Sequence, residues 1–372
     1  MRAPDLDRLT PEFVRRFEPY MPSQPDPELM KLYRIGHLHR LNNNENPLGP
    51  PPLAQEVIRR FPPPRAGIYP SGDSWYLRQA LARRFGLDPD QFLVGNGANE
   101  VISFAIKAFC QEGDNIITAD RTFAVYEWVA NFSGFEARLA PLKDFGFDDE
   151  ALLRLIDRRS KIIFICNPNN PTGTWWDRER LERFLARVDG QQIVVLDEAY
   201  REFVDRPEFP DGIQMLNRHP NLLVFRTFSK IYALAGLRVG YLAGSPEVVD
   251  AIRRTCVVYS VNILAQEAAL AALADDADHL AATRALVARE KAYLLEELAA
   301  LGLTVQNGEG CFLMIRLPLS DTMAYRRLLQ QGVMIRSMTG FRFPNWIRVS
   351  IGSHLAMEAF IAALRGILPS RS

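Results

Sequence analysis

Four polar residues of different chemical type follow one another along the middle of the chain, each beside a short apolar run. Asn170, Asp197 and Lys230 come after three such runs, and Arg238 precedes a fourth. An amine can form a Schiff base with an aldehyde, a carboxylate can keep a pyridine nitrogen protonated, and a guanidinium can bind phosphate. These types together suit pyridoxal 5′-phosphate. Each residue alone has an ordinary structural explanation, so the prediction depends on their conjunction.

The elements that must position these residues are short strands alternating with helices. From about residue 91 to 245, β-branched runs alternate with helical patterns, which predicts βαβ units and a mostly parallel sheet. Ligands of such sheets bind beyond the carboxyl ends of the strands. The predicted strands cover residues 92–94, 115–118, 161–166, 193–196, 222–225 and 239–242, and a helix buries Val101, Ile102, Ala105, Ile106 and Phe109.

The pattern changes after Asn262 to an Ala/Leu-rich helical stretch through Ala299, followed by mixed elements with strands at 313–315 and 347–351. We therefore predict an α/β fold with three parts. Residues 1–41 form an N-terminal arm that packs with the small domain or a partner subunit. Residues 42–261 form a large cofactor-binding domain, and residues 262–372 form a smaller α+β domain.

Composition excludes several classes of protein. The 372 residues include 44 basic and 44 acidic side chains, so the net charge is zero and neither nucleic acid nor a membrane surface is an expected partner. The four cysteines lie far apart, and His37 and His39 have no third ligand in view, so no metal site is expected. The N-terminal residues carry no apolar run typical of a signal peptide, and the expected location is the cytoplasm.

Several motifs place the chain near a known family. Residues 226–241, around Lys230, resemble the lysine signature of fold-type-I aminotransferases that depend on pyridoxal phosphate. Residues 42–50, 169–173, 197–200 and 347–352 are similar to the histidinol-phosphate aminotransferase subgroup. The resemblance extends from about residue 20 to the C-terminus.

The resemblance implies a role for each matching residue. Lys230 forms the Schiff base, Asp197 pairs with the ring nitrogen, Asn170 and Tyr200 bind the 3′ oxygen, and Phe123 stacks on the ring. The phosphate is bound by the backbone amides of Ala98 and Asn99, by Thr227, Ser229 and Arg238, and by Tyr69 of a neighbouring subunit, which implies a homodimer. Arg348 binds the substrate carboxylate, and Arg336 and Asn46 complete the substrate site.

The implied activity is transfer of an amino group between an L-amino acid, either histidinol phosphate or an aromatic or related amino acid, and a 2-oxo acid such as 2-oxoglutarate, by a ping-pong mechanism. Residues 258–260 and 308–311 differ from the usual subgroup sequences, which leaves a decarboxylase, cyclase or eliminase on the same fold as an alternative. A non-catalytic regulator is a third reading, but residues 1–42 carry no basic cluster for binding DNA.

Overall fold

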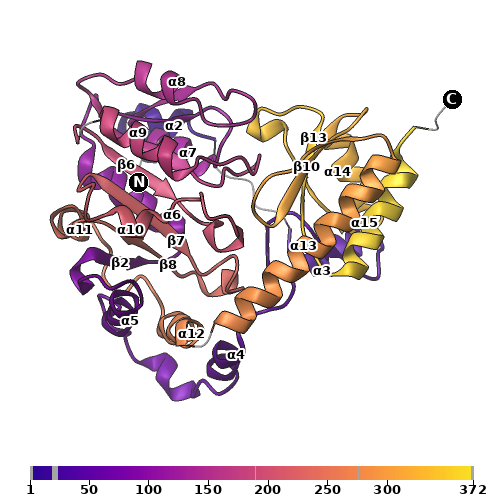
Figure 1. The fold of residues 1–372 in the computed structure, drawn as a ribbon, viewed down its shortest axis with the longest axis horizontal. Coiled ribbons are helices and arrows are strands. Elements are labelled where there is room, and N and C mark those ends of the chain that lie inside the picture. The colour runs from indigo at the N-terminus through magenta and orange to yellow at the C-terminus, as the bar shows by residue number, and fades with distance from the viewer. Residues whose placement is uncertain (1–2, 19–23, 189, 275, 370–372) are drawn as a thin grey trace.

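A seven-stranded sheet forms the centre of the larger part of the molecule (Figure 1). The computed structural model describes residues 3–18, 24–188, 190–274 and 276–369. The strand order is β2-β8-β7-β6-β5-β3-β4. The strands are β2 (Phe92–Gly95), β3 (Asn115–Ala119), β4 (Glu136–Ala140), β5 (Ser160–Cys166), β6 (Ile193–Asp197), β7 (Leu222–Thr227) and β8 (Gly240–Ala243).

The sheet is parallel except for β8, which runs antiparallel to both β2 and β7. The prediction of a mostly parallel sheet is therefore confirmed, with β8 as the exception. Its connection from β7 contains a short 3-10 turn, η4 (Ala235–Leu237), where a parallel return would need a crossover helix. Strand β4 was not predicted, because it lies at the sheet edge with Glu136 exposed and lacks a β-branched run.

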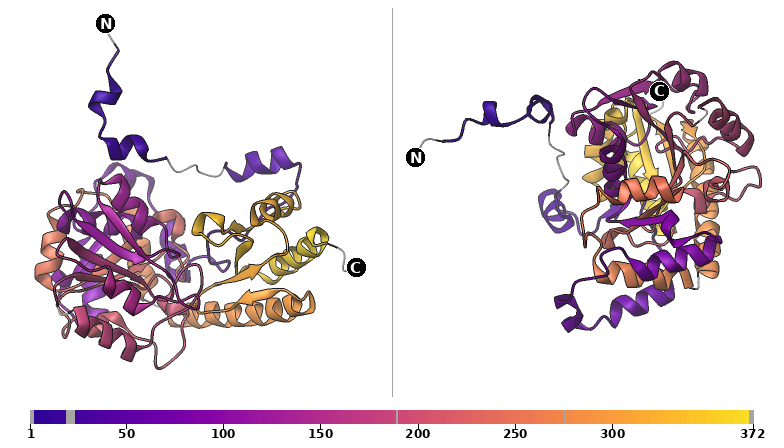
Figure 2. Two further views of the ribbon diagram at one scale, coloured as in Figure 1. Left: turned by 90° about the horizontal axis from the view of Figure 1, so that it is seen from above. Right: turned by 90° about the vertical axis from the view of Figure 1, so that its left-hand side faces the viewer.

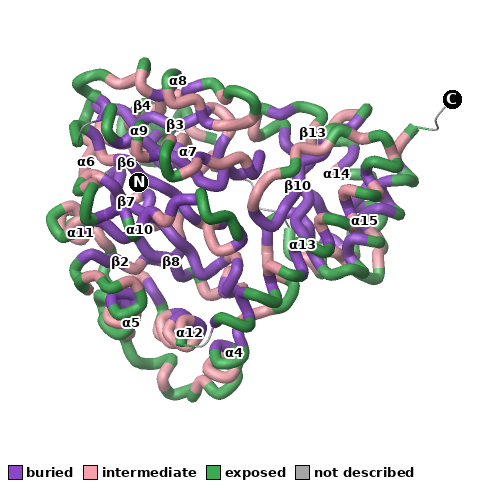
Figure 3. Tube along the Cα trace, in the orientation of Figure 1, coloured by how far each residue is buried: buried purple, intermediate pink, exposed green. Residues whose placement is uncertain are grey.

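Helices cover this sheet and bury their apolar faces on it. In α6 (Ala98–Phe109) the buried residues include Val101, Ile102, Ala105 and Ile106, as the helical spacing predicts. Figure 3 shows buried strands surrounded by helices with exposed outer faces. The other helices of the larger part are α4 (Pro52–Arg59), α5 (Trp75–Phe85), α7 (Val125–Phe132), α8 (Asp149–Arg154), α9 (Arg178–Val188), α10 (Gly212–Met215), α11 (Pro246–Arg253) and α12 (Ile263–Ala274). It also contains the 3-10 turns η1 (Pro63–Gly67), η2 (Pro89–Gln91) and η3 (Arg201–Phe203).

A four-stranded antiparallel sheet of order β12-β13-β10-β9 forms the second part. Its elements are α13 (Ala277–Ala300), β9 (Thr304–Gln306), β10 (Phe312–Arg316), α14 (Asp321–Leu329), β12 (Arg336–Ser337), η5 (Thr339–Phe341), β13 (Trp346–Ser350) and α15 (His354–Ile367). The Ala/Leu-rich stretch is two helices, because α12 packs on α4 and α5 whereas α13 packs on α15 (Figure 1). Within the described ranges, every helix is too short or too polar to span a membrane.

The N-terminal segment reaches both parts. Helices α1 (Leu6–Leu9) and α2 (Glu12–Arg16) have no buried residues. Helix α1 extends away from the body (Figure 2), whereas α2 contacts α7. Helix α3 (Asp26–Tyr33) inserts Leu29 against Leu329 and Met334. Strand β1 (His39–Arg40) then pairs in parallel with β11 (Val333–Met334), so the chain enters the larger part from the side of the smaller sheet.

Two glycines bring the two sheets into backbone contact. A Cβ added to Gly308 would lie 2.4 Å from the carbonyl carbon of Gly173, and the Glu309 N–H donates to the Gly173 oxygen at 2.7 Å. Gly173 ends the loop that carries Asn170, so this contact connects the smaller sheet to a predicted site residue.

The Gly308→Ala variant should be destabilised, because its methyl group meets backbone atoms that cannot turn aside. We expect a loss of about 1–3 kcal/mol in the free energy of unfolding, as in overpacked cores. Gly36→Ala is the matched control, since nothing lies within 4 Å of its added Cβ. Urea unfolding of both variants measures the difference, and equal stability of the two would contradict the argument.

Candidate active site

A cavity of about 420 Å³ lies at the carboxyl ends of β5, β6 and β7. Both sheets and the segment after β1 contribute to its wall. The lining residues are Asn43, Asn44, Glu45, Ala98, Asn99, Phe123, Cys166, Asn170, Asp197, Ala199, Tyr200, Thr227, Ser229, Lys230, Ala235, Gly236, Arg238, Arg336, Phe341 and Arg348. The sheet topology therefore gathers most of the predicted residues at one place.

The Lys230 amine follows β7 and donates to the carbonyl oxygen of Asn43 at 2.8 Å. Burial lowers the pKa of Lys230 to about 8, and the positive charges of Arg348 and Arg238 act in the same direction. The charges of Cys311 and Glu45 oppose this shift. Roughly a tenth of the amine is therefore the free base at pH 7, far more than for an ordinary lysine, and the free base is the form that reacts with an aldehyde.

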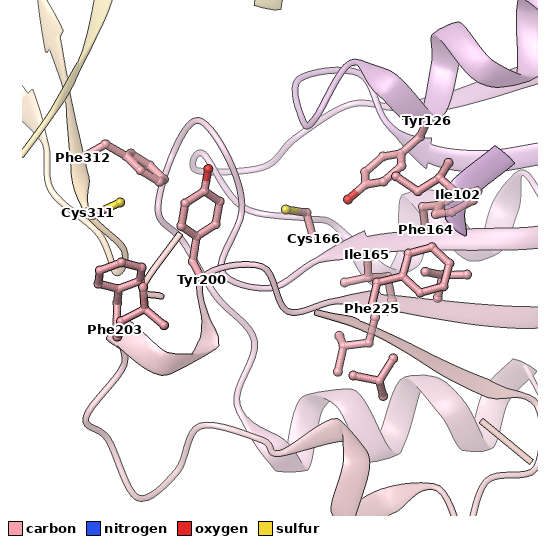
Figure 4. Close-up of a cluster of buried hydrophobic side chains, with 14 of the residues drawn as sticks. Ile102, Tyr126, Phe164, Ile165, Cys166, Tyr200, Phe203, Phe225, Cys311 and Phe312 are labelled. Atoms are coloured by element: carbon pink, nitrogen blue, oxygen red, sulfur yellow. The ribbon is translucent and has the colours of Figure 1, made fainter. Parts of the chain in front are cut away.

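Asp197 ends β6 and is 2% exposed. It accepts a hydrogen bond from the Tyr126 hydroxyl at 2.5 Å and one from the Ala199 N–H at 3.1 Å. Burial raises the pKa of Asp197, while these hydrogen bonds favour its ionised form. Figure 4 shows Tyr126 directed toward Cys166, and its ring stacks on Phe164 at 4.7 Å. The carboxylate is thus fixed from behind by a side chain in the core.

A cradle for a phosphate lies at the start of α6. Gly97 has φ +74°, and a Cβ there would lie 2.3 Å from a terminal nitrogen of Arg238. Only glycine lets the guanidinium lie this close to the helix start, where the first N–H groups have no partner within the helix. The hydroxyl of Thr227 accepts from the Ser229 N–H at 3.0 Å, which leaves its own proton for another acceptor. These donors fit a phosphate dianion.

Arg348 supplies a second place for an anion. It lies on β13, is 5% exposed, and donates to Asn170 Oδ1 and to the carbonyl oxygen of Asn42, the latter at 2.6 Å. Among the described residues it has no ion-pair partner, and its buried Nε has no hydrogen-bond partner. Burial lowers the pKa of Arg348 to about 10, with Arg336 contributing. A buried cation without a carboxylate is suited to bind an anionic ligand.

Tyr200 and Phe123 complete the wall near these charges. The Tyr200 hydroxyl accepts from Asn44 Nδ2 at 2.8 Å, and Asn44 is itself bound to the Ser350 hydroxyl at 2.8 Å. Burial raises the pKa of Tyr200, so its hydroxyl stays protonated and can donate. Phe123 lines the cavity with its ring edge-on to Tyr126 at 5.6 Å.

Two predicted residues lie outside this cavity. Tyr69 is 79% exposed and its ring lies 4.9 Å from that of Tyr259, so it does not reach the cavity of its own chain. Asn46 donates its amide to the carbonyl oxygen of Ile231 and to Thr283, at 2.8 and 3.1 Å. Asn46 therefore fixes the segment before α4 and does not line the cavity.

Four residues near the site were not predicted from the sequence: Tyr126, Asn44, Glu45 and Phe341. Tyr126 follows Phe123 by one helical turn at the start of α7, and that spacing was the available signal. Phe341 lies in a short 3-10 turn with no pattern that indicates a site. Among the described residues, no group of three or more His, Cys, Asp or Glu side chains could hold a metal ion.

Comparison with known proteins identifies the family of this chain. Residues 37–364 match the family model of class I and II aminotransferases. The chain is 40% identical to histidinol-phosphate aminotransferase of Anaeromyxobacter sp. (strain Fw109-5), covering 97% of this chain and 99% of that protein. It is 41% identical to histidinol-phosphate aminotransferase 2 of Pseudomonas aeruginosa, covering 98% and 99%.

A solved structure shows the same fold. The histidinol-phosphate aminotransferase of Sinorhizobium meliloti, crystallised with pyridoxal-5′-phosphate, superimposes with a TM-score of 0.85 at 25% identity, over 95% of this chain and 96% of that one. The resemblance drawn from the motifs is confirmed, and the chain belongs to the class I and II aminotransferases.

Proposed function

We propose that this protein is a pyridoxal-phosphate-dependent aminotransferase that exchanges an amino group between histidinol phosphate, or an aromatic or related amino acid, and a 2-oxo acid such as 2-oxoglutarate. Its two half-reactions follow one another in a ping-pong order. One observation carries the proposal: a half-buried lysine with a lowered pKa shares a cavity with a buried carboxylate and with a buried arginine that has no ion-pair partner among the described residues.

The cavity residues divide into those that hold the cofactor and those that act on the substrate. Pyridoxal phosphate supplies the aldehyde and the electron-accepting ring when it is bound. Arg238, Thr227, Ser229 and the amides of Ala98 and Asn99 would hold its phosphate. Asp197 would face the ring nitrogen, Phe123 would pack on the ring, and Asn170 and Tyr200 would bind its 3′ oxygen.

Lys230 would move the proton that the reaction requires. Once the substrate occupies the cavity, the neutral amine can remove the proton from the substrate Cα and hold it until it is returned to a different carbon. Burial keeps this amine partly neutral at neutral pH. The carbonyl oxygen of Asn43 accepts a hydrogen bond from this amine at 2.8 Å and so orients it.

Arg348 would bind the anionic group next to the amine-bearing carbon. Amino acids carry a carboxylate there, whereas histidinol phosphate carries a phosphate ester and no carboxylate. A planar guanidinium binds either group through two parallel hydrogen bonds. The free Nε of Arg348 and its lack of an ion-pair partner in the described chain support this role.

The proposal includes a homodimer. Tyr69 is too exposed to serve its own cavity, and it belongs to a cluster of large apolar side chains beside an apolar groove of about 570 Å³ that Ile263 and Leu270 help to line. Surfaces of this kind are typical of interfaces. The cluster consists of Ile68, Tyr69, Trp75, Tyr76, Val257, Val258 and Tyr259, each between 48% and 79% exposed.

When an amino donor is added to the cofactor-loaded protein, the visible absorption spectrum of the cofactor should change and a 2-oxo acid should be released. Lys230→Ala should lower turnover by about 10²- to 10⁴-fold, because it removes the proton-transfer group. Borohydride should attach the cofactor to Lys230. Lys291 provides an internal control, since burial also lowers its pKa to about 8 although it does not line the cavity. Carbon dioxide or a cyclised product without a 2-oxo acid would contradict transamination.

Acetylation of Lys230 in the cofactor-free protein should become faster with rising pH, with a midpoint near 8. The sign follows because the reactive neutral amine accumulates above its pKa. Arg348→Met should move the midpoint upward, since the Arg348 charge lowers this pKa. Limiting acetic anhydride with peptide mass spectrometry measures the profile, and a midpoint near the ordinary lysine value of about 10.4 would disprove the lowered pKa.

Arg348→Met should raise the KM of both amino donor and 2-oxo acid acceptor by about 10- to 100-fold, because charged hydrogen bonds to each are lost. Arg348→Lys should recover little of this loss, since an ammonium cannot form the planar fork. Arg327→Met, an exposed change on α14, is the control. Steady-state kinetics over both substrates measures the effect, and an unchanged KM would show that Arg348 does not contact substrate.

A further inference from the structure

A second arginine of the cavity, Arg336, lies over the ring of Phe341, a residue to which the proposed function assigns no role. The Arg336 guanidinium carbon lies 5.8 Å from the centroid of the Phe341 ring, and both side chains line the cavity. Arg336 is the register partner of Arg348 on the neighbouring strand. A guanidinium over a ring face is attracted to it, so Phe341 restricts where Arg336 can point.

The segment that carries Phe341 is fixed by a buried carboxylate. Asp321 is 1% exposed and accepts from the Ser337 hydroxyl at 2.5 Å. It also accepts from the N–H and hydroxyl of Thr339 at 2.8 and 2.7 Å, and from the Asn345 N–H at 3.1 Å. These hydrogen bonds lower the pKa of Asp321 although burial opposes them. The turn is therefore organised before any ligand binds.

A salt bridge then connects this turn to the larger sheet. Arg342 donates to both carboxylate oxygens of Glu127 on α7, at 3.0 and 2.8 Å, and to the carbonyl oxygen of Asp120 at 2.6 Å. Arg342 directly follows Phe341 and has φ +61°. The turn that carries Phe341 follows β12 of the smaller sheet, and the Arg342 contacts attach this turn to the larger part of the molecule. They therefore hold the Phe341 ring at the cavity.

The charges in the cavity indicate what Arg336 binds. Among the described residues it has no ion-pair partner, and its charge adds to that of Arg348. The two acidic side chains in the wall are engaged elsewhere: Asp197 accepts from Tyr126, and Glu45 is held by Arg40 at 3.1 and 3.2 Å. Two adjacent guanidinium groups without a carboxylate favour a ligand with two negative charges.

We propose that Phe341 is a positioning residue that holds Arg336 in place for the second negative charge of a doubly charged substrate, with the Arg342–Glu127 salt bridge keeping the turn in position. The inference rests on the proposed function and deepens it. The shared chemistry is a dianion, which either a phosphate monoester or a dicarboxylate supplies.

Phe341→Leu should raise the KM of histidinol phosphate and of glutamate by about 3- to 5-fold, as expected for a lost cation–π contact, and leave the KM of phenylalanine within about 1.5-fold. The kcat values should not change, and Phe341→Tyr should restore both KM values. Arg342→Met should act in the same direction. A response to histidinol phosphate alone, or to glutamate alone, identifies which dianion Arg336 receives.

A double-mutant cycle tests whether Phe341 acts through Arg336. In the Arg336→Met background, Phe341→Leu should change KM by less than about 1.5-fold. Trp175→Leu is the matched control, because Arg206 lies 6.0 Å from the Trp175 ring and neither residue lines the cavity. Equal effects on all three donors, or a full effect of Phe341→Leu without Arg336, would overturn the inference.

A binding measurement separates this inference from the proposed function. Succinate and propionate can be titrated into the purified protein by calorimetry, without turnover. Phe341→Leu should weaken succinate binding about 3-fold and leave propionate binding unchanged. If no amino donor is turned over but this difference is seen, the proposed function fails and the dianion site stands. If donors are turned over and the difference is absent, only the dianion site fails.

Discussion

The arrangement of this protein depends on placing a few ionisable groups away from water. Arg348 is buried with an unsatisfied Nε, and the Lys230 amine is buried enough that its pKa falls to about 8. Removing such groups from water costs free energy, which packing elsewhere must offset. The large core, which includes buried residues of both sheets, supplies that packing (Figure 3).

Two independent sheets have to meet for the site to exist. Lys230 and Asp197 follow strands of the larger sheet, whereas Arg336 and Arg348 lie on the smaller one. The Gly173–Gly308 contact and the Arg342–Glu127 salt bridge connect the two across separate parts of the cavity. Because the wall is shared, small shifts between the sheets change the separation of the anion-binding and amine groups.

Residues behind the site form hydrogen bonds with the residues and turns that line it. Tyr126 holds Asp197 from the core, Asn44 connects Tyr200 to Ser350, and Asp321 organises the turn before Phe341. Each of these supports is a hydrogen bond made in a buried or half-buried place, where an unsatisfied partner is costly. The functional side chains are thereby oriented in advance, which reduces the entropy lost when a ligand binds.

The sequence alone predicted the fold class, six strands of the larger sheet, and the residues that follow them, because β-branched periodicity and residue type are local properties. It also determined the family, since the motif around Lys230 is contiguous. The folded structure was needed to show that β8 runs antiparallel and that Asn46 bonds to Ile231 away from the cavity. It also showed that Tyr126 supports Asp197 and that Phe341 supports Arg336. These features depend on contacts between segments far apart in the chain, and no local pattern records which distant side chains will meet.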